Sequence, residues 1–376
     1  MGYIDLHSRP FDQTTITKLE LFEEYLEAWL PTFIMTDKSI NKEIHVFDLF
    51  AGTGYDINGI EGSPIRFLDK LAKFLDLLQA KKKKVVFHFN EFEPNIKEQN
   101  KFKTLRESCN EFLDKNIKLK SYCDVNYYNE DFKVIFDKLY PIIDLNPSLV
   151  FLDQNGIKFL KIDYLKKFEN TKMTDFIYFL SSSYVWRFSE QKEFQKYLDI
   201  DVKALKISGY KKIHRTITKH LQGKLGENSN LKLYPFSLLK GNNIHGLIFG
   251  ATHYLAVDKF LNLAWKRNAK NGDANFDIDE EEANKQLSIF DDQKPTKIQK
   301  FKTNLKSKIL KRKIINNKEA LIYAYSNGHI SKHSSDLIRE LKKAKLIDYN
   351  ARSPNISYNA VFKNRIIVEF KLRNNG

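Results

Sequence analysis

The chain has 376 residues, 42% of them hydrophobic, which fits one large domain with a buried core and a smaller second domain. Its 62 Lys and Arg residues against 47 Asp and Glu residues give a net charge of +15 and a pI near 9.3. This excess favours nucleic acid as a partner, and a Lys-rich genome composition is the alternative explanation. Two cysteines exclude a disulfide framework and a zinc cluster. The lack of an apolar signal segment, or of a run of about 18 apolar residues, predicts a soluble cytoplasmic protein with no membrane segment.

An amphipathic helix over residues 17–33 is the first predicted element. Its apolar residues recur at spacings of three and four, which places them on one face. They are Leu19, Phe22, Tyr25, Leu26, Trp29 and Leu30. Thr14, Thr15 or Thr17 could cap this helix, with Glu20 as the capping-box partner of Thr17.

A short buried strand over residues 45–50 then runs into a glycine loop. Glycine lets the backbone approach a ligand closely, and ligands of open α/β sheets bind outside the carboxyl ends of the strands. The pattern Asp48-x-Phe50-x-Gly52-x-Gly54 resembles the first motif of S-adenosylmethionine (SAM) methyltransferases and lacks the third glycine of a dinucleotide-binding loop. These four residues are therefore candidate SAM contacts, and an ordinary tight turn is the alternative.

A helix with an apolar stripe from Ile65 to Leu78 follows the glycine loop. Pro64 suits its first turn, and Ser63 is its predicted cap. Ser63 is also a candidate contact for a substrate or nucleic acid. The lysines at 81–84 complement the dipole at the end of the helix.

Acidic residues follow the second and third predicted strands. The strand over 85–89 leads to Glu91, whose carboxylate can accept hydrogen bonds from both hydroxyls of a ribose, and Glu93 is the alternate. The strand over 119–125 is followed by Asp131. This residue fits the acid that bonds the adenine amine in SAM-binding domains, with Phe132 available for stacking.

The fourth predicted strand, Leu149–Asp153, leads into Gln154, Asn155 and Gly156. Methyltransferases that act on exocyclic amines carry an acid or amide, two prolines and an aromatic residue here. This chain keeps the acid but lacks the prolines and the aromatic residue. Asp153 and Asn155 are therefore candidate catalytic residues, but the sequence does not identify an amine as the methyl acceptor. Methylation of cytosine C5 is rejected because this loop has no cysteine nucleophile.

The fifth predicted strand, Asp175–Leu180, is followed by three serines and then Arg187, which could line a substrate cleft. The alternative is a helix capped by Ser183 with aromatic residues in the core. A basic helix is predicted over 207–224. Strands over 231–239 and 244–251 then form an antiparallel pair that closes a mostly parallel sheet, and a helix over 259–267 completes a domain of residues 1–270.

Residues 271–300 are rich in Asp and Glu and form a predicted acidic linker, in which no metal site is expected because the pattern lacks the glycine and final glutamate of an EF-hand. Residues 301–376 show the helix, helix, two-stranded wing pattern of a winged-helix domain. Its elements are a helix over 318–325, a helix capped by Ser334 or Ser335, and a hairpin of strands 358–362 and 365–370. The second helix carries candidate nucleic-acid contacts at Lys332, Arg339, Lys342 and Lys343. Protein docking is the alternative role.

Taken together, these stretches resemble the three-Cys-motif partner protein (TcmP) family of bacteria and mobile elements. The resemblance runs through Thr17–Leu21, Tyr25–Trp29, Asp48–Gly54, Gly62–Pro64, Asn90–Glu91, Phe151–Asp153, Arg187–Phe188, Ile248–Ala251, Lys259–Lys266 and Gly272–Asp279. It implies a class I SAM-methyltransferase-like domain, a C-terminal winged helix, and a radical-SAM-like partner that carries three cluster-binding cysteines. Gln154 and Asn155 depart from the Asp-Pro that members often show.

The leading functional hypothesis is a SAM-dependent methyltransferase acting on or with nucleic acid, DNA more than RNA, in a mobile-element or phage-defence context. The alternative is a catalytically inactive, nucleic-acid-binding subunit that recruits the radical-SAM-like protein. A nuclease is disfavoured because no acid–acid–Lys cluster and no P-loop occur.

Overall fold

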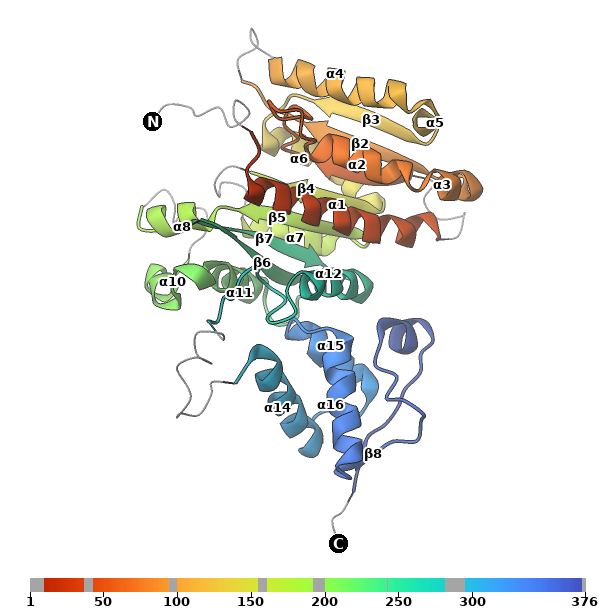
Figure 1. Ribbon diagram of the computed structural model, residues 1–376, viewed down its shortest axis with the longest axis vertical. Helices are drawn as coiled ribbons and strands as arrows, with labels where there is room; N and C mark the ends of the chain where they lie inside the picture. Colours follow the sequence, from red (N-terminus) through yellow and green to blue (C-terminus); the bar gives the residue numbers. More distant parts are fainter. Residues whose placement is uncertain are drawn as a thin grey trace. The chain divides into compact units, whose positions relative to one another are not determined.

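The structure is a computed structural model that describes residues 10–36, 43–94, 100–154, 161–191, 200–241, 243–280 and 295–373. The chain forms two units, which divide after His253 (Figure 1). The first unit therefore ends before residue 270, because α12 (Tyr254–Arg267) packs with the helices that follow it. Asp258 of α12, for example, accepts a hydrogen bond from the hydroxyl of Tyr325 at 2.6 Å.

A seven-stranded sheet in the order β3-β2-β1-β4-β5-β7-β6 forms the centre of the first unit. Strands β1 to β5 are parallel, and β7 runs antiparallel to both of its neighbours. The strands are β1 (Glu43–Asp48), β2 (Lys84–Asn90), β3 (Cys123–Tyr128), β4 (Ser148–Leu152), β5 (Thr174–Leu180), β6 (Lys232–Lys240) and β7 (Asn243–Ala251). The predicted α/β class and antiparallel closing pair are confirmed, and the sheet is consistent with a Rossmann-like methyltransferase fold.

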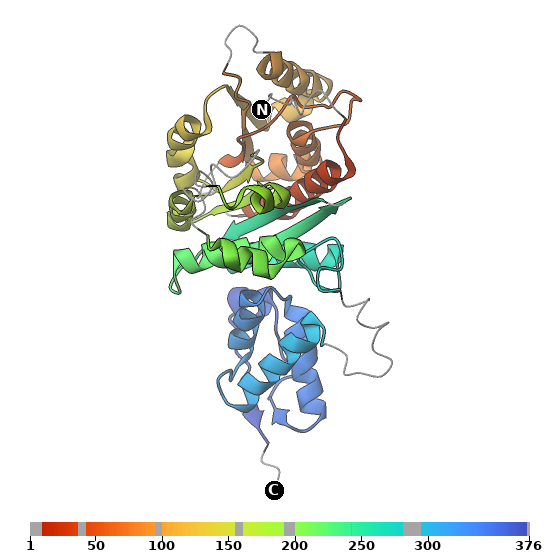
Figure 2. The ribbon, with the colours of Figure 1, turned by 90° about the vertical axis from the view of Figure 1, so that its left-hand side faces the viewer.

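Helices cover both faces of this sheet, and in Figure 2 the red and orange helices lie on the opposite side from the yellow ones. One face carries α1 (Gln13–Ile34), α2 (Ser63–Ala72), α3 (Leu75–Lys81) and α4 (Asn100–Lys115). The other carries α6 (Phe132–Leu145), α7 (Ile162–Asn170) and α11 (Ile213–Leu225). The short helices α5 (Ile117–Lys120), α8 (Ser182–Phe188) and α10 (Val202–Ser208) lie in the connections.

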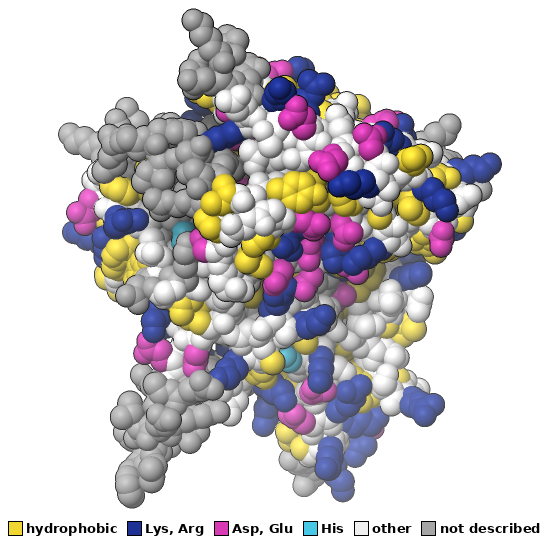
Figure 3. Space-filling model, turned by 45° about the horizontal axis from the view of Figure 1, so that its top comes forward, with side chains coloured by type: hydrophobic (Ala, Val, Ile, Leu, Met, Phe, Trp, Pro, Cys, Tyr) yellow, Lys and Arg dark blue, Asp and Glu magenta, His cyan; other side chains and the backbone are white. Residues whose placement is uncertain are grey.

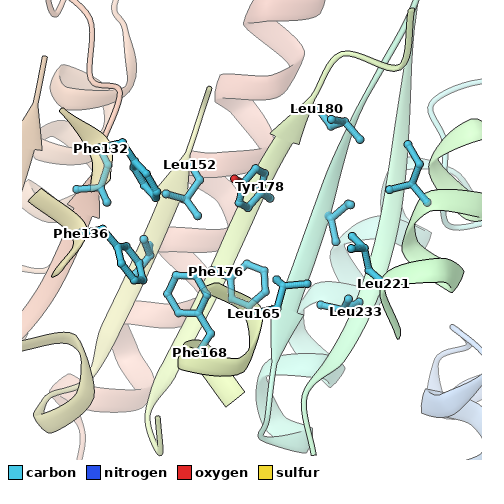
Figure 4. Close-up of a cluster of buried hydrophobic side chains, with 14 of the residues drawn as sticks. Phe132, Phe136, Leu152, Leu165, Phe168, Phe176, Tyr178, Leu180, Leu221 and Leu233 are labelled. Carbon is cyan, nitrogen blue, oxygen red and sulfur yellow. The ribbon is translucent and has the colours of Figure 1, made fainter. Parts of the chain in front are cut away.

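Buried aromatic and aliphatic side chains join the sheet to α6, α7 and α11 (Figure 4). Phe168 of α7 stacks on Phe176 of β5 at 4.5 Å and meets Phe136 of α6 edge-on at 5.5 Å. Leu152 and Leu180, the last residues of β4 and β5, are fully buried in the same cluster. Each such side chain contributes about 1.5–3 kcal/mol by leaving water, so the cluster fixes the carboxyl ends of these strands.

On the opposite face, α1 and α2 pack on β4. Phe22 and Phe67 lie 4.8 and 4.6 Å from the ring of Phe151. The predicted apolar face of α1 is buried as expected. Its predicted threonine cap is wrong, because Asp12 precedes the helix and accepts hydrogen bonds from the first free N–H groups.

Several predicted boundaries also differ. The helix after the glycine loop is two helices, α2 and α3, separated by Lys73 and Phe74. Its predicted cap is wrong, because Gly62 precedes α2 and the hydroxyl of Ser63 bonds elsewhere. The predicted basic helix over 207–224 is broken at Gly209, whose φ of +81° is incompatible with a continuous helix.

The second unit contains α12, α14 (Lys297–Leu310), α15 (Asn317–Ser326), α16 (Ser331–Lys343) and a sheet of β8 (Ile347–Asp348) and β9 (Lys371–Leu372). Ile330 precedes α16, so the predicted caps Ser334 and Ser335 are wrong, and both lie buried inside the helix. Among the described residues, no helix combines the length and apolarity needed to cross a bilayer.

The predicted strand over 358–362 is wrong, because residues 359–363 form one helical turn. Tyr358 and Phe362 satisfy the two-residue period of a strand and equally the i, i+4 spacing of a helix. The helical alternative prevails because both rings then meet, at 5.5 Å, and Phe362 stacks on Tyr254 at 4.9 Å.

Candidate active site

The order of the strands reverses direction between β1 and β4, and this topological switch point is where open α/β sheets bind ligands. The glycine loop leaves β1 at this point. Gly52 and Gly54 have φ values of +69° and +92°, and a Cβ on Gly54 would lie 2.9 Å from Cβ of Ser108. Gly54 therefore requires glycine, the positive φ of Gly52 favours it, and the loop presents bare backbone at the switch point.

Glu91 faces the glycine loop from the end of β2. Its Oε2 accepts a hydrogen bond from the N–H of Gly52 at 2.8 Å. Burial raises the pKa of Glu91 to about 7, and the Gly52 N–H opposes that rise. The alternate acid, Glu93, accepts instead from the N–H of Phe102 in α4, so Glu91 is the acid at the loop.

Asn90 is a positioning residue that the sequence did not single out. Its amide donates to the carbonyls of Leu49 and Glu130 at 3.2 and 3.1 Å, and its Oδ1 accepts from the N–H of Glu130. These bonds hold together the segments that leave β1, β2 and β3. A buried amide beside an acid at a strand end was the available signal.

Asp131 caps α6 and accepts a hydrogen bond from the N–H of Lys133 at 3.0 Å. Phe132 was predicted to be available for stacking on a ligand, and this is wrong. Its side chain is 2% exposed and stacks on Phe50 at 5.5 Å. Phe50 therefore lies against the core beneath the loop.

Asp48, the last residue of β1, is almost fully buried. It accepts hydrogen bonds from the hydroxyl of Ser63 at 2.5 Å and from the N–H of Phe50 at 3.2 Å. Burial raises its pKa to about 6, the Ser63 bond opposes the rise, and the charge of Asp153 adds to it. Asp48 thus joins the start of the glycine loop to the first turn of α2.

Asp153, one residue past β4, forms an ion pair with Lys18 of α1. The side chains are 24% and 9% exposed, and the ammonium of Lys18 lies 4.7 Å above the ring of Phe179. The sequence did not single out Lys18 as a site residue, although a lone lysine on the buried face of an amphipathic helix was a usable signal. Asn155 lies outside the described residues.

The remaining candidate residue of the first unit is Arg187, in α8. It is exposed, and its Nε donates to the carbonyl of Ser183 in its own helix. The alternative cap at Ser183 is wrong, because α8 begins after Ser181 and the Ser183 hydroxyl bonds to the backbone of Ile244.

In the second unit, α16 pairs two of the predicted nucleic-acid contacts within the chain. Arg339 lies 3.3 Å from Asp336, and Lys342 contacts Asp348 at 3.1 Å and the carbonyl of Tyr349 at 2.8 Å. Lys332 and Lys343 are exposed. Throughout the part of the chain that the structure describes, no three His, Cys, Asp or Glu side chains are grouped as a metal site requires.

No protein-family model matches the chain, and no curated protein is similar to it in sequence. Three solved structures show a weak likeness to it. A proposed O-methyltransferase from Klebsiella pneumoniae is 11% identical with a TM-score of 0.30, over 64% of this chain and 90% of that one. Trm1 from Pyrococcus horikoshii, solved with S-adenosyl-L-methionine, is 10% identical with a TM-score of 0.33, over 68% of this chain and 61% of that one.

The third, the delta-N METTL16 methyltransferase domain, is 12% identical with a TM-score of 0.28, over 67% of this chain and 88% of that one. At these scores the likenesses carry no argument of their own. The basis for the Rossmann-like fold remains the order and direction of the seven strands.

Proposed function

We propose that the first unit binds SAM at the switch point and that the protein is a class I SAM-dependent methyltransferase. The observation that carries this proposal is the hydrogen bond between Gly52 and Glu91, which joins the positive-φ glycine loop to a half-buried acid at the next strand end. The proposed arrangement places the adenosyl group over Gly52 and Gly54, with its ribose hydroxyls on Glu91 and its adenine amine beside Asp131.

The residues present fit such a ligand at the loop. The positive φ values of both glycines leave backbone in place of side chains, and Glu91 offers a carboxylate at the height of the loop. Bound SAM supplies a methyl group on a positively charged sulfur. Negative charge nearby, on Asp48 at the start of the loop, favours such a cation.

The role of this chain in methyl transfer is to position the acceptor. Lys18 holds the carboxylate of Asp153 at the end of β4, next to the glycine loop. In-line displacement needs no covalent nucleophile, and alignment of two bound reactants can supply about 7–11 kcal/mol of the barrier. Lys18 and Asp153 together present a donor and an acceptor, which suits a polar group on the methyl acceptor.

The proposed acceptor or partner is nucleic acid, DNA more than RNA, and the second unit supports this by its charge. The proposed second unit is a winged-helix-like module built from α14, α15, α16 and the β8–β9 sheet. The TcmP resemblance adds a proposed radical-SAM-like partner and a mobile-element or phage-defence context. These features support a nucleic-acid methyltransferase over one for small molecules.

Isothermal titration calorimetry with SAM and S-adenosylhomocysteine tests the proposal. One site per chain is expected, and no heat from either ligand up to millimolar concentration would contradict it. A second candidate function, an inactive binding subunit, is favoured by the absence of the Pro-Pro-aromatic sequence after Asp153. Binding of SAM without transfer of a labelled methyl group to DNA or RNA would select this second candidate.

A further inference from the structure

Nearly all of the net charge of the protein lies in residues 295–373, the C-terminal part of the second unit. Residues 295–373 hold nineteen Lys and Arg side chains and five Asp and Glu side chains, a net charge of +14 out of +15 for the whole chain. The rest of the chain is therefore almost neutral. A genome-wide preference for lysine would raise the charge everywhere, so this concentration requires a reason specific to the second unit.

Six of these side chains lie at one end of the unit, where α14, α16 and the last strand finish. We call the set the basic end; its members are Lys311, Arg312, Lys313, Lys343, Lys345 and Lys371. Backbone hydrogen bonds bring the segments together. The N–H of Phe370 donates to Ile315 at 2.7 Å, and the N–H of Arg373 donates to Leu346 at 3.1 Å. All six side chains are exposed, and Figure 3 shows Lys and Arg side chains crowded on the visible face of this unit.

Three of the five acids in residues 295–373 pair with bases outside the basic end. Lys302 pairs with Glu340, Arg339 with Asp336, and both Lys342 and Arg373 with Asp348. Among the described residues, no ion pair involves a member of the basic end. The basic end therefore gathers six bases that have no ion pair among the described residues, whereas half of the contacts predicted on α16 are already paired.

The backbone at two members of the basic end strengthens this assignment. Arg312 and Lys345 have φ values of +54° and +57°, and each stands just past the end of a helix. Both helix ends are Schellman motifs, since the next N–H reaches back to the carbonyl of Lys308 at 2.8 Å and of Leu341 at 3.0 Å. Glycine is preferred at this position because an L-residue is strained there. The chain instead carries a long cationic side chain at both.

We propose that the basic end binds the phosphate backbone of duplex nucleic acid. This inference rests on the nucleic-acid partner of the proposed function and is independent of SAM. A duplex is favoured over a single strand because single-strand sites stack bases on exposed aromatic rings. The large hydrophobic side chains exposed in the described part of this unit are Ile315, Ile366 and Ile367, none of them aromatic.

The double variant Arg312→Gly/Lys345→Gly separates binding from folding, because glycine relieves the strained backbone while it removes the charge. The probe is a fluorescein-labelled DNA duplex of mixed sequence, followed by anisotropy across a salt series. Loss of two phosphate contacts makes the negative slope of log association constant against log salt concentration shallower by about 1.8. It also weakens binding roughly 10- to 100-fold at about 0.1 M salt. The thermal midpoint is expected to be unchanged or higher.

Lys82→Gly is the matched control. Lys82 also has a positive φ, of +52°, at a helix end, but it lies in the first unit. Its replacement makes the same chemical change and is expected to leave the affinity for the duplex unchanged. An equal loss in Lys82→Gly, or wild-type affinity in the double variant, would overturn the inference.

Two further measurements distinguish failure of this inference from failure of the proposed SAM site. Binding to anionic phosphatidylserine vesicles but not to the duplex would overturn the inference in favour of a membrane surface. Titration of the double variant with S-adenosylhomocysteine is expected to match the wild type. If the double variant binds both S-adenosylhomocysteine and the duplex as the wild type does, only the proposed basic end is wrong. If the double variant loses duplex binding and the wild type binds no S-adenosylhomocysteine, only the proposed SAM site is wrong.

Discussion

Replacement of Glu91 by Gln is the perturbation whose outcome follows most directly from the geometry. Burial raises the pKa of Glu91 to about 7 from an ordinary 4.5. The difference corresponds to a penalty of roughly 3 kcal/mol on the carboxylate in the folded chain. Because the folded pKa is the higher one, the folded chain avoids this penalty below about pH 4.5, where Glu91 is protonated in both states. It loses roughly 3 kcal/mol of stability as the pH rises through about 7. Glu91→Gln removes the loss, so urea unfolding of the variant should depend less on pH between 5 and 8.

The affinity for the ligand should change with pH in the opposite direction to the stability. Ribose hydroxyls that donate to Glu91 favour its carboxylate, so binding of S-adenosylhomocysteine should release a proton near pH 7. With a pKa of about 7, roughly a tenth of the group is ionised at pH 6 and roughly nine tenths at pH 8, so the affinity should rise about tenfold. Calorimetry in two buffers of different ionisation enthalpy measures both the affinity and the proton.

Glu93→Gln is the matched control, because Glu93 bonds to the N–H of Phe102 rather than to the glycine loop. It should keep the pH dependence of the wild type, while Glu91→Gln binds weakly and almost independently of pH. A wild-type pH profile for binding in Glu91→Gln, or uptake of a proton on binding, would show that Glu91 does not bind the ribose.

Three further outcomes are expected. Lys18→Met should lower the free energy of unfolding by about 1–3 kcal/mol, because it leaves Asp153 without its partner. The double variant Lys18→Met/Asp153→Leu should recover part of that loss in urea titrations. Gly54→Ala should cost about 1–2 kcal/mol through its strained φ and weaken S-adenosylhomocysteine binding at least about tenfold, whereas unchanged binding would place the ligand elsewhere. His88 is a buried residue of β2, and burial lowers its pKa to about 3. His88→Phe should therefore reduce acid sensitivity, because the contribution of a neutral His88 to stability is present above about pH 6.5 and roughly 2 kcal/mol of it is lost by about pH 5. An identical loss between pH 7 and 5 in wild type and variant would contradict the last outcome.

The glycine loop and Glu91 could be predicted because their signals are local. A buried strand, two glycines and an acid at the next strand end lie within short stretches, and the alternation of strands and helices brings those ends to one edge of the sheet. The same holds for the apolar face of α1, which follows from spacing alone.

What could not be predicted depends on contacts between distant residues. Lys18 and Asp153 are 135 positions apart, and only the packing of α1 on β4 brings them together. Asn90 acts by reaching two other segments, which no local pattern encodes. The predictions for Phe132 and for the 358–362 segment were wrong because their side chains suit two environments equally in the sequence. Contacts with distant residues decide between the two, with Phe50 for Phe132 and with Tyr254 for Phe362.

A crystal structure of the protein with S-adenosylhomocysteine tests the central claim most directly. We expect the ribose hydroxyls within hydrogen-bonding distance of the Glu91 carboxylate, with the rest of the ligand lying across Gly52 and Gly54. A ligand bound away from the β1–β4 switch point, or in contact with neither Glu91 nor the glycine loop, would contradict it.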